Sequence, residues 1–313
     1  MTLSTTVSPV RNLPLSAGGD LVTRLARERD PVRAVVELVW NAIDAEAGTV
    51  RVGIVRTALD AIESVTIEDD GHGISSDEVQ STFGRIGGSW KALQTRSKND
   101  KRGLHGKFGE GRLRAFALGS RVTWVSESFN AAGQRERVVI AGTKDRAEPF
   151  SWEASPSTGE SFGTIVTALN EQDRSLNSLT SDMTLATLTS HFAPVLLNDE
   201  GLKVVFDGAA LDPRDEILDD TTVEAVLDSD PTAVISIRIL EWRTGKHRAV
   251  YFGEDAERFV VEASGTELES QATFSAYVTW AGFDVDSLSE LGLGDMAPDP
   301  AGAVWRATKN AVR

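Results

Sequence analysis

The sequence predicts two domains, a mixed α/β sandwich followed by a strand-rich α+β domain. Its 313 residues exceed one average domain, and 41% hydrophobic and 25% charged residues are typical of a globular chain. The apolar period changes from helical to alternating after residue 47, and strand patterns dominate beyond residue 190. We therefore expect an arm over residues 1–20, a first domain over 21–190 and a second over 191–313.

The first domain is expected to open with helices and to continue with strands. Helical spacing runs from Leu21 to Ala47, and Asp30-Pro31 begins the second of two helices. A short helix over 75–83, a loop over 89–102 and a helical turn over 114–118 are expected further along. Alternating apolar and polar residues predict strands over 49–55, 64–68, 121–126, 136–141 and 164–169.

The second domain is predicted from a run of strand patterns separated by turn signals. The strands are expected over 202–206, 233–242, 247–252, 258–262 and 273–280. The final residues, 301–313, have helical spacing.

Composition excludes several kinds of chemistry. The chain has no cysteine, so it has no disulfide, thiolate nucleophile or iron–sulfur cluster. Its four histidines lie at 72, 105, 191 and 247 without metal-ligand spacing, so any metal must be a hard ion bound by oxygen. No apolar run approaches about 18 residues, and polar residues interrupt the first twenty, so we expect neither a membrane span nor a secretory signal. The expected location is the cytoplasm.

Charge is unevenly distributed along the chain. The net charge of -15 opposes adsorption to nucleic acid or anionic lipid. Between Arg85 and Arg114, however, nine cations and two anions give a local charge of +7. A solvated basic loop would explain the charge alone, whereas a phosphate site also explains the glycines clustered there.

The common nucleotide motifs are missing. Gly106-Lys107 and Gly245-Lys246 are not followed by Ser or Thr, so there is no Walker loop. No G-x-G-x-x-G run occurs, and neither protein-kinase signature is present. Rossmann and protein-kinase folds are therefore excluded.

The first of four informative segments is Glu37-Leu38-Val39-Trp40-Asn41-Ala42-Ile43-Asp44-Ala45. On a helix, Glu37, Asn41 and Asp44 share one polar stripe. A stripe that simply faces solvent is the alternative interpretation. If it faces a cleft, Asn41 offers a neutral oxygen to Mg²⁺, and Glu37, one turn earlier, is placed to orient and deprotonate an attacking water.

The second segment is Glu68-Asp69-Asp70-Gly71-His72-Gly73-Ile74, directly after a predicted strand. A carboxylate at a strand end accepts a hydrogen bond from an exocyclic amine such as that of adenine, and glycines let the backbone approach a flat ring. An ordinary hairpin turn is the alternative explanation of Asp-Gly at this place.

The third and fourth segments are rich in glycine. Gly103 to Arg112 carries four glycines in nine residues before a helical stretch, which suits backbone N–H groups that bind phosphate oxygens. A flexible linker is less consistent with its Phe and Leu. In Phe162-Gly163-Thr164-Ile165-Val166, one strand hydroxyl could support Asp69.

In this order and spacing, the four segments resemble the ATP-binding domain of the GHKL superfamily, which includes gyrase, the ninety-kilodalton heat-shock chaperone, sensor histidine kinases and MutL proteins. The resemblance covers roughly residues 20 to 170. It implies a two-layer sandwich of the Bergerat type that hydrolyses ATP with Mg²⁺. It further implies that Glu37 is the general base, Asn41 the magnesium ligand and Asp69 the adenine acceptor. The other residues it assigns to ATP binding are Asp44, Gly71, Gly73, Ile74, Lys91, Gly106, Lys107, Phe108, Gly109, Glu110, Gly111 and Thr164.

The resemblance also sets expectations for the second domain and for partners. The segment after residue 190 resembles a transducer domain, and Lys246 or Lys309 is a candidate to reach the γ-phosphate. A lid over about residues 83 to 111 is expected to close on ATP, and the closed form to dimerise through the arm. A nucleotide-gated module with little hydrolysis and a GHKL-type protein kinase remain alternatives. The subfamily, the client and any nucleic-acid partner stay open.

Overall fold

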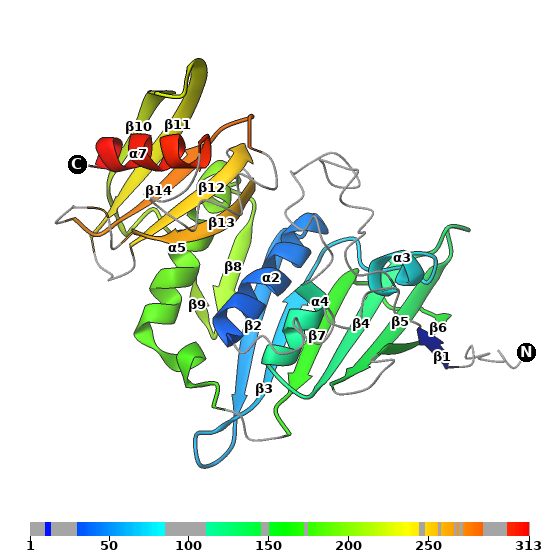
Figure 1. The fold of residues 1–313 in the computed structure, drawn as a ribbon. Coiled ribbons are helices and arrows are strands. Elements are labelled where there is room, and N and C mark those ends of the chain that lie inside the picture. The colour runs from blue at the N-terminus through cyan, green and yellow to red at the C-terminus, as the bar shows by residue number, and fades with distance from the viewer. Residues whose placement is uncertain are drawn as a thin grey trace, which may run out of the picture. The chain divides into compact units, whose positions relative to one another are not determined.

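The computed structural model describes residues 10–13, 30–84, 111–144, 150–171, 175–243, 248–255, 258–265, 268, 272–283 and 299–312 (Figure 1). The chain divides into two compact units. Unit 1 comprises Met1–Thr184 and Gly201–Leu211, and unit 2 comprises Leu185–Glu200 and Asp212–Arg313.

Unit 1 is built on a sheet that has nine strands within the described residues, in the order β1-β6-β5-β4-β7-β3-β2-β8-β9. Neighbouring strands run antiparallel except β2 and β8, which run parallel. The strands are β1 (Arg11–Leu13), β2 (Thr49–Arg56), β3 (Ile62–Asp69), β4 (Arg121–Phe129), β5 (Arg135–Thr143), β6 (Phe150–Pro156), β7 (Gly163–Leu169), β8 (Lys203–Phe206) and β9 (Ala209–Ala210).

Helices cover one face of this sheet, which makes unit 1 a two-layer sandwich. In Figure 1, α2, α3 and α4 lie on the same side of the strands. Strand residues alternate between buried and accessible, as expected when one face packs against helices and the other does not. The helical elements are α2 (Pro31–Asp44), α3 (Val79–Phe83), α4 (Gly111–Arg114), η2 (Ala115–Ala117) and η3 (Asn177–Thr180). The predicted α+β sandwich is confirmed.

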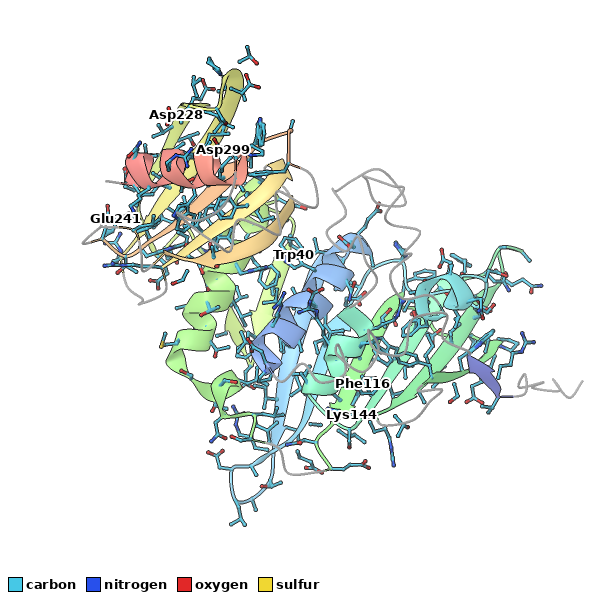
Figure 2. The ribbon with its side chains drawn as sticks, in the orientation of Figure 1. Trp40, Phe116, Lys144, Asp228, Glu241 and Asp299 are labelled. Carbon is cyan, nitrogen blue, oxygen red and sulfur yellow. The ribbon has the colours of Figure 1, made fainter. Side chains whose placement is uncertain are left out.

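An aromatic cluster joins the helices of unit 1 to strands β4 and β6. The ring of Phe83 on α3 contacts those of Trp124 and Phe150 edge-on, with centroids 5.1 and 5.3 Å away. Phe116, which follows α4 (Figure 2), stacks on Phe150 at 6.0 Å. Such aromatic pairs add about 0.5–1.5 kcal/mol each beyond the area they bury. This cluster therefore fixes the chain on both sides of residues 85–110.

Unit 2 is a five-stranded sheet, counted over the described residues, with a helix on each face. The strand order is β10-β11-β14-β12-β13, and only β12 and β14 pair in parallel. Asp228 lies at the tip of the β10–β11 hairpin (Figure 2). The elements are β10 (Ile217–Leu227), β11 (Asp230–Trp242), β12 (Ala249–Asp255), β13 (Arg258–Ser264), β14 (Phe274–Thr279), α5 (Asp182–Asn198) and α7 (Ala301–Val312).

The two faces of the second sheet carry separate cores. Val250 and Phe252 pack in one core with Trp305 of α7. Their neighbours Ala249 and Tyr251 pack in another core that contains Ala193 of α5. Because successive strand residues point to opposite faces, α5 and α7 cover opposite sides of the sheet.

Several elements differ from the sequence prediction, and the strands β1, β6 and β9 have no predicted counterpart. β8, predicted within the second domain, pairs with β2 in the sheet of unit 1, and Asp207-Gly208 then turns the chain into β9, which pairs with β8. α5 was not predicted, because Pro194 inside it argues against a helix. β10 was not predicted either, because this acidic edge strand buries little of its surface.

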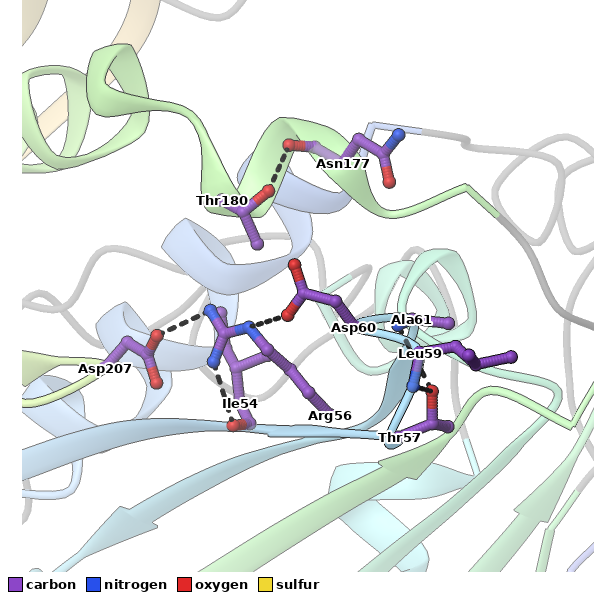
Figure 3. A network of polar contacts seen from close by, with 9 residues as sticks. All are labelled: Ile54, Arg56, Thr57, Leu59, Asp60, Ala61, Asn177, Thr180 and Asp207. Carbon is purple, nitrogen blue, oxygen red and sulfur yellow. Dashed lines mark hydrogen bonds and ion pairs between the residues drawn. The ribbon is translucent and has the colours of Figure 1, made fainter.

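A polar network ties β8 and β9 to the β2–β3 hairpin (Figure 3). Arg56 donates to Asp207 Oδ2 at 2.8 Å and lies 3.7 Å from Asp60 Oδ1. The Arg56 side chain is 31% exposed and that of Asp207 is 32% exposed, so this contact supports a sheet edge near the surface.

Among the described residues, no helix has the length and apolar character needed to cross a membrane.

Candidate functional site

Helix α2 carries the predicted polar stripe. The N–H groups of Val32 and Arg33 donate to Asp30 Oδ1 at 2.9 and 3.3 Å, which caps the helix start, and Pro31 occupies the first turn. The opposite side of the helix is apolar and buried, and it includes Leu38, Val39 and Ile43. Packing of this side fixes the direction in which the polar residues point.

The three polar residues of α2 differ in burial. Glu37 is half-buried, Asn41 is exposed and Asp44 is buried. Glu37 Oε1 lies 3.7 Å from Nε of Arg114 at the end of α4. A half-buried carboxylate beside a cation, one turn before an accessible amide, supplies a base and a neutral oxygen ligand on the same helix.

Asp69 ends strand β3 beside β7. Its Oδ1 accepts hydrogen bonds from the N–H groups of Gly71 at 2.9 Å and Thr164 at 3.3 Å. Within the described part of the chain, no donor reaches Oδ2. Although Asp69 is half-buried as a residue, desolvation of its carboxyl raises the pKa from 3.8 to about 7, against the lowering effect of both backbone donors. The second oxygen is thus a desolvated acceptor.

The two glycines after Asp69 are required by close approaches. A Cβ on Gly71 would lie 2.6 Å from the carbonyl oxygen of Ala45, the residue that ends α2. Gly73 has φ +72°, and its Cβ would lie 2.4 Å from the Glu127 carbonyl oxygen. The His72 N–H also donates to Ala45 O at 2.9 Å. This segment therefore lies directly against the end of α2.

A buried hydroxyl pair supports the segment from the sheet side. Ser126 Oγ accepts from the Ile74 N–H at 2.6 Å and lies 3.1 Å from Thr164 Oγ1. Ser126 is fully buried, and Thr164 is 6% exposed. Sequence reasoning found Thr164 but missed Ser126. The sequence does carry a signal for Ser126, because this small polar residue occupies an inward position of strand β4 at which an apolar residue is expected.

Asp70, next to Asp69, has a structural role. Its Oδ1 accepts from the N–H groups of Gly48 at 2.7 Å and Thr49 at 2.8 Å, so it braces the connection from α2 to β2. The hairpin-turn alternative for this segment is wrong, because β3 continues into an irregular stretch that reaches α3.

The glycine-rich segment is described only at its end. Lys91, Gly106, Lys107, Phe108, Gly109 and Glu110 lie outside the described residues, as does Lys246. Gly111 begins α4, and Arg112 on this short helix places its guanidinium 5.7 Å from the Phe83 ring centroid. Burial lowers the pKa of Arg112 to about 10. Lys309, the other candidate to reach the γ-phosphate, lies on α7 of unit 2.

Thus the structure brings Asp69, Gly71, Gly73, Ile74 and Thr164 together at the end of β3, and Gly71 lies against the end of α2. Glu37 and Asn41 lie on that helix, two turns and one turn before its end. That Glu37, Asn41 and Asp69 face one cavity stays a prediction.

The described residues contain no group of three or more Asp, Glu or His side chains that could hold a metal ion. The accessible amide oxygen of Asn41 is nevertheless a hard donor of the kind Mg²⁺ takes from a protein while phosphates and waters complete its shell. The donor set at this position therefore fits Mg²⁺ bound together with a phosphate ligand.

Comparison with known families identifies the domain that carries this site. Residues 30–155 match the family model described as histidine kinase-, DNA gyrase B- and HSP90-like ATPase. The match begins at the cap of α2 and ends within β6, so it includes Glu37, Asn41 and Asp69. A comparison with curated proteins finds no match.

Proposed function

Since residues 30–155 form a histidine kinase-, DNA gyrase B- and HSP90-like ATPase domain, which is an ATP-binding domain of the GHKL type, we propose that this protein hydrolyses ATP with Mg²⁺. The observation that carries the proposal is the acceptor at the end of β3. Two backbone donors hold Asp69 Oδ1, and Oδ2 is left for the exocyclic amine of adenine.

The residues of α2 take the chemical roles. Glu37 orients the attacking water and accepts its proton, and its half-buried carboxylate keeps contact with solvent from which that water comes. Asn41 would hold Mg²⁺, which would supply positive charge that stabilises the phosphate groups. Asp44 lies one turn beyond, buried at the end of the helix.

The adenine ring is recognised by residues at the end of β3 and by the residues that hold them in place. Gly71 and Gly73 let this stretch of backbone pack closely against Ala45 and Glu127, which fixes it beside the Asp69 acceptor. Thr164 and Ile74 hold its position through Ser126. Guanine, which presents a carbonyl oxygen where adenine has its amine, offers no donor to Asp69 and should bind poorly.

The lid, the dimer and the second unit complete the proposal. Lys91 and Gly106 to Gly111 neutralise and wrap the phosphates, and the lid closes on ATP more firmly than on ADP because only ATP offers it a γ-phosphate. The closed form dimerises through the N-terminal arm, and Lys246 and Lys309 are the candidates to reach the γ-phosphate. These steps follow from the family resemblance.

The decisive experiment compares wild type with Glu37→Gln. We expect Glu37→Gln to bind Mg-ATP with unchanged affinity by calorimetry but to lose hydrolysis in single-turnover and steady-state assays, because the base is gone and the binding contacts remain. Glu63→Gln, which changes an exposed carboxylate on strand β3, is the matched control and should retain wild-type turnover.

Other outcomes identify the alternatives. ATP binding without single-turnover hydrolysis by wild type would favour the nucleotide-gated module. Transfer of the γ-phosphate to a protein side chain would favour a kinase. Equal loss of binding and hydrolysis in Glu37→Gln would contradict the role of Glu37.

A further inference from the structure

The residue that faces the proposed base comes from the end of the glycine-rich segment. Arg114 Nε lies 3.7 Å from Glu37 Oε1, which is the distance of an ion pair and longer than a hydrogen bond. The Arg114 side chain is 11% exposed and that of Glu37 is 33% exposed. The buried Arg114 guanidinium therefore lies next to the Glu37 carboxylate, which is still accessible to solvent.

Packing on both sides fixes Arg114. α4 packs against α2, and Leu113, Ala115 and Phe116 around Arg114 are each at most 1% exposed. A guanidinium in such surroundings is costly unless an anion compensates it, and a charged neighbour within about 4–6 Å favours the ionised carboxylate. The packing around Arg114 and the burial of its side chain thus restrict where the guanidinium can lie relative to Glu37.

We propose that Arg114 is a positioning residue that holds the Glu37 carboxylate ionised and oriented for its role as general base. The inference rests on the hydrolysis proposed above and adds to it the residue on which the base depends. Sequence reasoning counted Arg114 only within the +7 cluster as a neutraliser of phosphate charge. Its burial against α2 assigns it to the base instead.

Three roles for Arg114 predict different results. A positioning role lowers kcat and leaves ATP affinity unchanged, because the bound ground state does not need the base. A direct contact with the γ-phosphate would weaken ATP binding more than ADP binding. A purely structural role would lower the folded fraction and leave the turnover of folded protein unchanged.

The test measures kcat and the calorimetric Kd for Mg-ATP and Mg-ADP in the full chain carrying Arg114→Met or Arg114→Lys. We expect Arg114→Met to lose about 10- to 100-fold in kcat, within the contribution of a general base. Both Kd values should stay within about twofold of wild type, a difference of less than about 0.5 kcal/mol in binding free energy. Arg114→Lys keeps the positive charge but lacks the planar guanidinium, so its kcat should lie between those of wild type and Arg114→Met.

Arg121→Met is the matched control. Arg121, the first residue of β4, also forms an ion pair with a glutamate, Glu171, at 3.3 Å, but both side chains are about half exposed, at 55% and 46%. We expect wild-type kcat from this variant. If Arg114→Met does not fold, Arg114→Lys carries the test, with a several-fold loss of kcat at unchanged Kd as the expected result.

Failure of the Arg114 inference can be distinguished from failure of the proposed function. Wild-type kcat in both Arg114 variants, with hydrolysis still lost in Glu37→Gln, overturns this inference alone. A weakened Kd for ATP in Arg114→Lys overturns it in favour of a phosphate contact. Absence of Glu37-dependent hydrolysis in wild type overturns the proposed function and this inference together.

Discussion

Replacement of Asp69 by Asn should affect stability and ATP binding in opposite directions. In the folded protein, desolvation raises the pKa of Asp69 from 3.8 to about 7, so the folded state holds this proton more tightly than the unfolded state does. The stability that the protonated carboxyl provides is fully present below about pH 4 and is lost as the pH rises through about 7. Because Asn is neutral at every pH, the variant does not lose this stability as the pH rises.

The size of the effect follows from the pKa change. A rise of about three units corresponds to about 4 kcal/mol at 1.36 kcal/mol per unit, as an upper bound. Asp69→Asn keeps an Oδ1 that accepts from Gly71 and Thr164, so its amide nitrogen takes the place of Oδ2. We therefore expect this variant without ligand to be up to about 4 kcal/mol more stable than wild type at pH 8, and of similar stability at pH 4.

ATP binding should weaken in the same variant. The Asn amide nitrogen presents a donor to the adenine amine, so the hydrogen bond is lost, at about 1–3 kcal/mol or about 5- to 150-fold in Kd. Urea denaturation at pH 4, 6 and 8 and calorimetry with Mg-ATP at pH 8 measure the two effects. Glu63→Gln, which changes another exposed carboxylate on β3, should stay within about 0.5 kcal/mol of wild type throughout.

A variant Asp69→Asn that is less stable than wild type at pH 8, or whose stability difference does not change with pH, would refute the link between this carboxyl and stability. Unchanged ATP affinity would refute the assignment of Asp69 to adenine.

Three further substitutions test the supports of the site and the sheet edge, each by urea denaturation. Gly163→Ala should destabilise unit 1 by more than about 2 kcal/mol, because Gly163 has φ +124° and its Cβ would lie 1.9 Å from Asp69 O; a neutral result contradicts this close approach of β7 to β3. Ser126→Ala should cost about 1–3 kcal/mol and weaken ATP binding, since the Ile74 N–H loses its acceptor; retained affinity would separate Ser126 from the site. Arg56→Ala should change stability by no more than about 1 kcal/mol, because its ion pair with Asp207 is near the surface; a larger loss would show that this edge strand depends on it.

The sequence predicted the helix and the strand that carry the candidate site residues better than it predicted the edges of the sheets. Helix α2 was predictable because Asp30-Pro31 marks its start and Leu38, Val39 and Ile43 give it an apolar face. The Asp69 segment was predictable because its polar and glycine residues follow a clearly alternating strand. The family match over residues 30–155 confirms the resemblance that these motifs suggested.

The misses have physical causes. Pro194 concealed α5, because a proline inside a helix removes a hydrogen bond, a loss that tertiary packing offsets in this helix. The parallel pairing of β8 with β2 joins segments far apart in the sequence, which local patterns do not reveal. Ser126 and Arg114 gain their roles only from the neighbours that folding gives them, a buried N–H and a carboxylate.

The proposed function requires Glu37, Asn41 and Asp69 to act on one molecule of ATP. A crystal structure of the full chain with Mg²⁺ and a non-hydrolysable ATP analogue decides whether they do. We predict the adenine amine within hydrogen-bond distance of Asp69 Oδ2, the metal ion on Asn41 Oδ1, and Glu37 facing the γ-phosphate across one water. An analogue bound elsewhere, or a metal ion without contact to Asn41, would show that these three residues do not form one site.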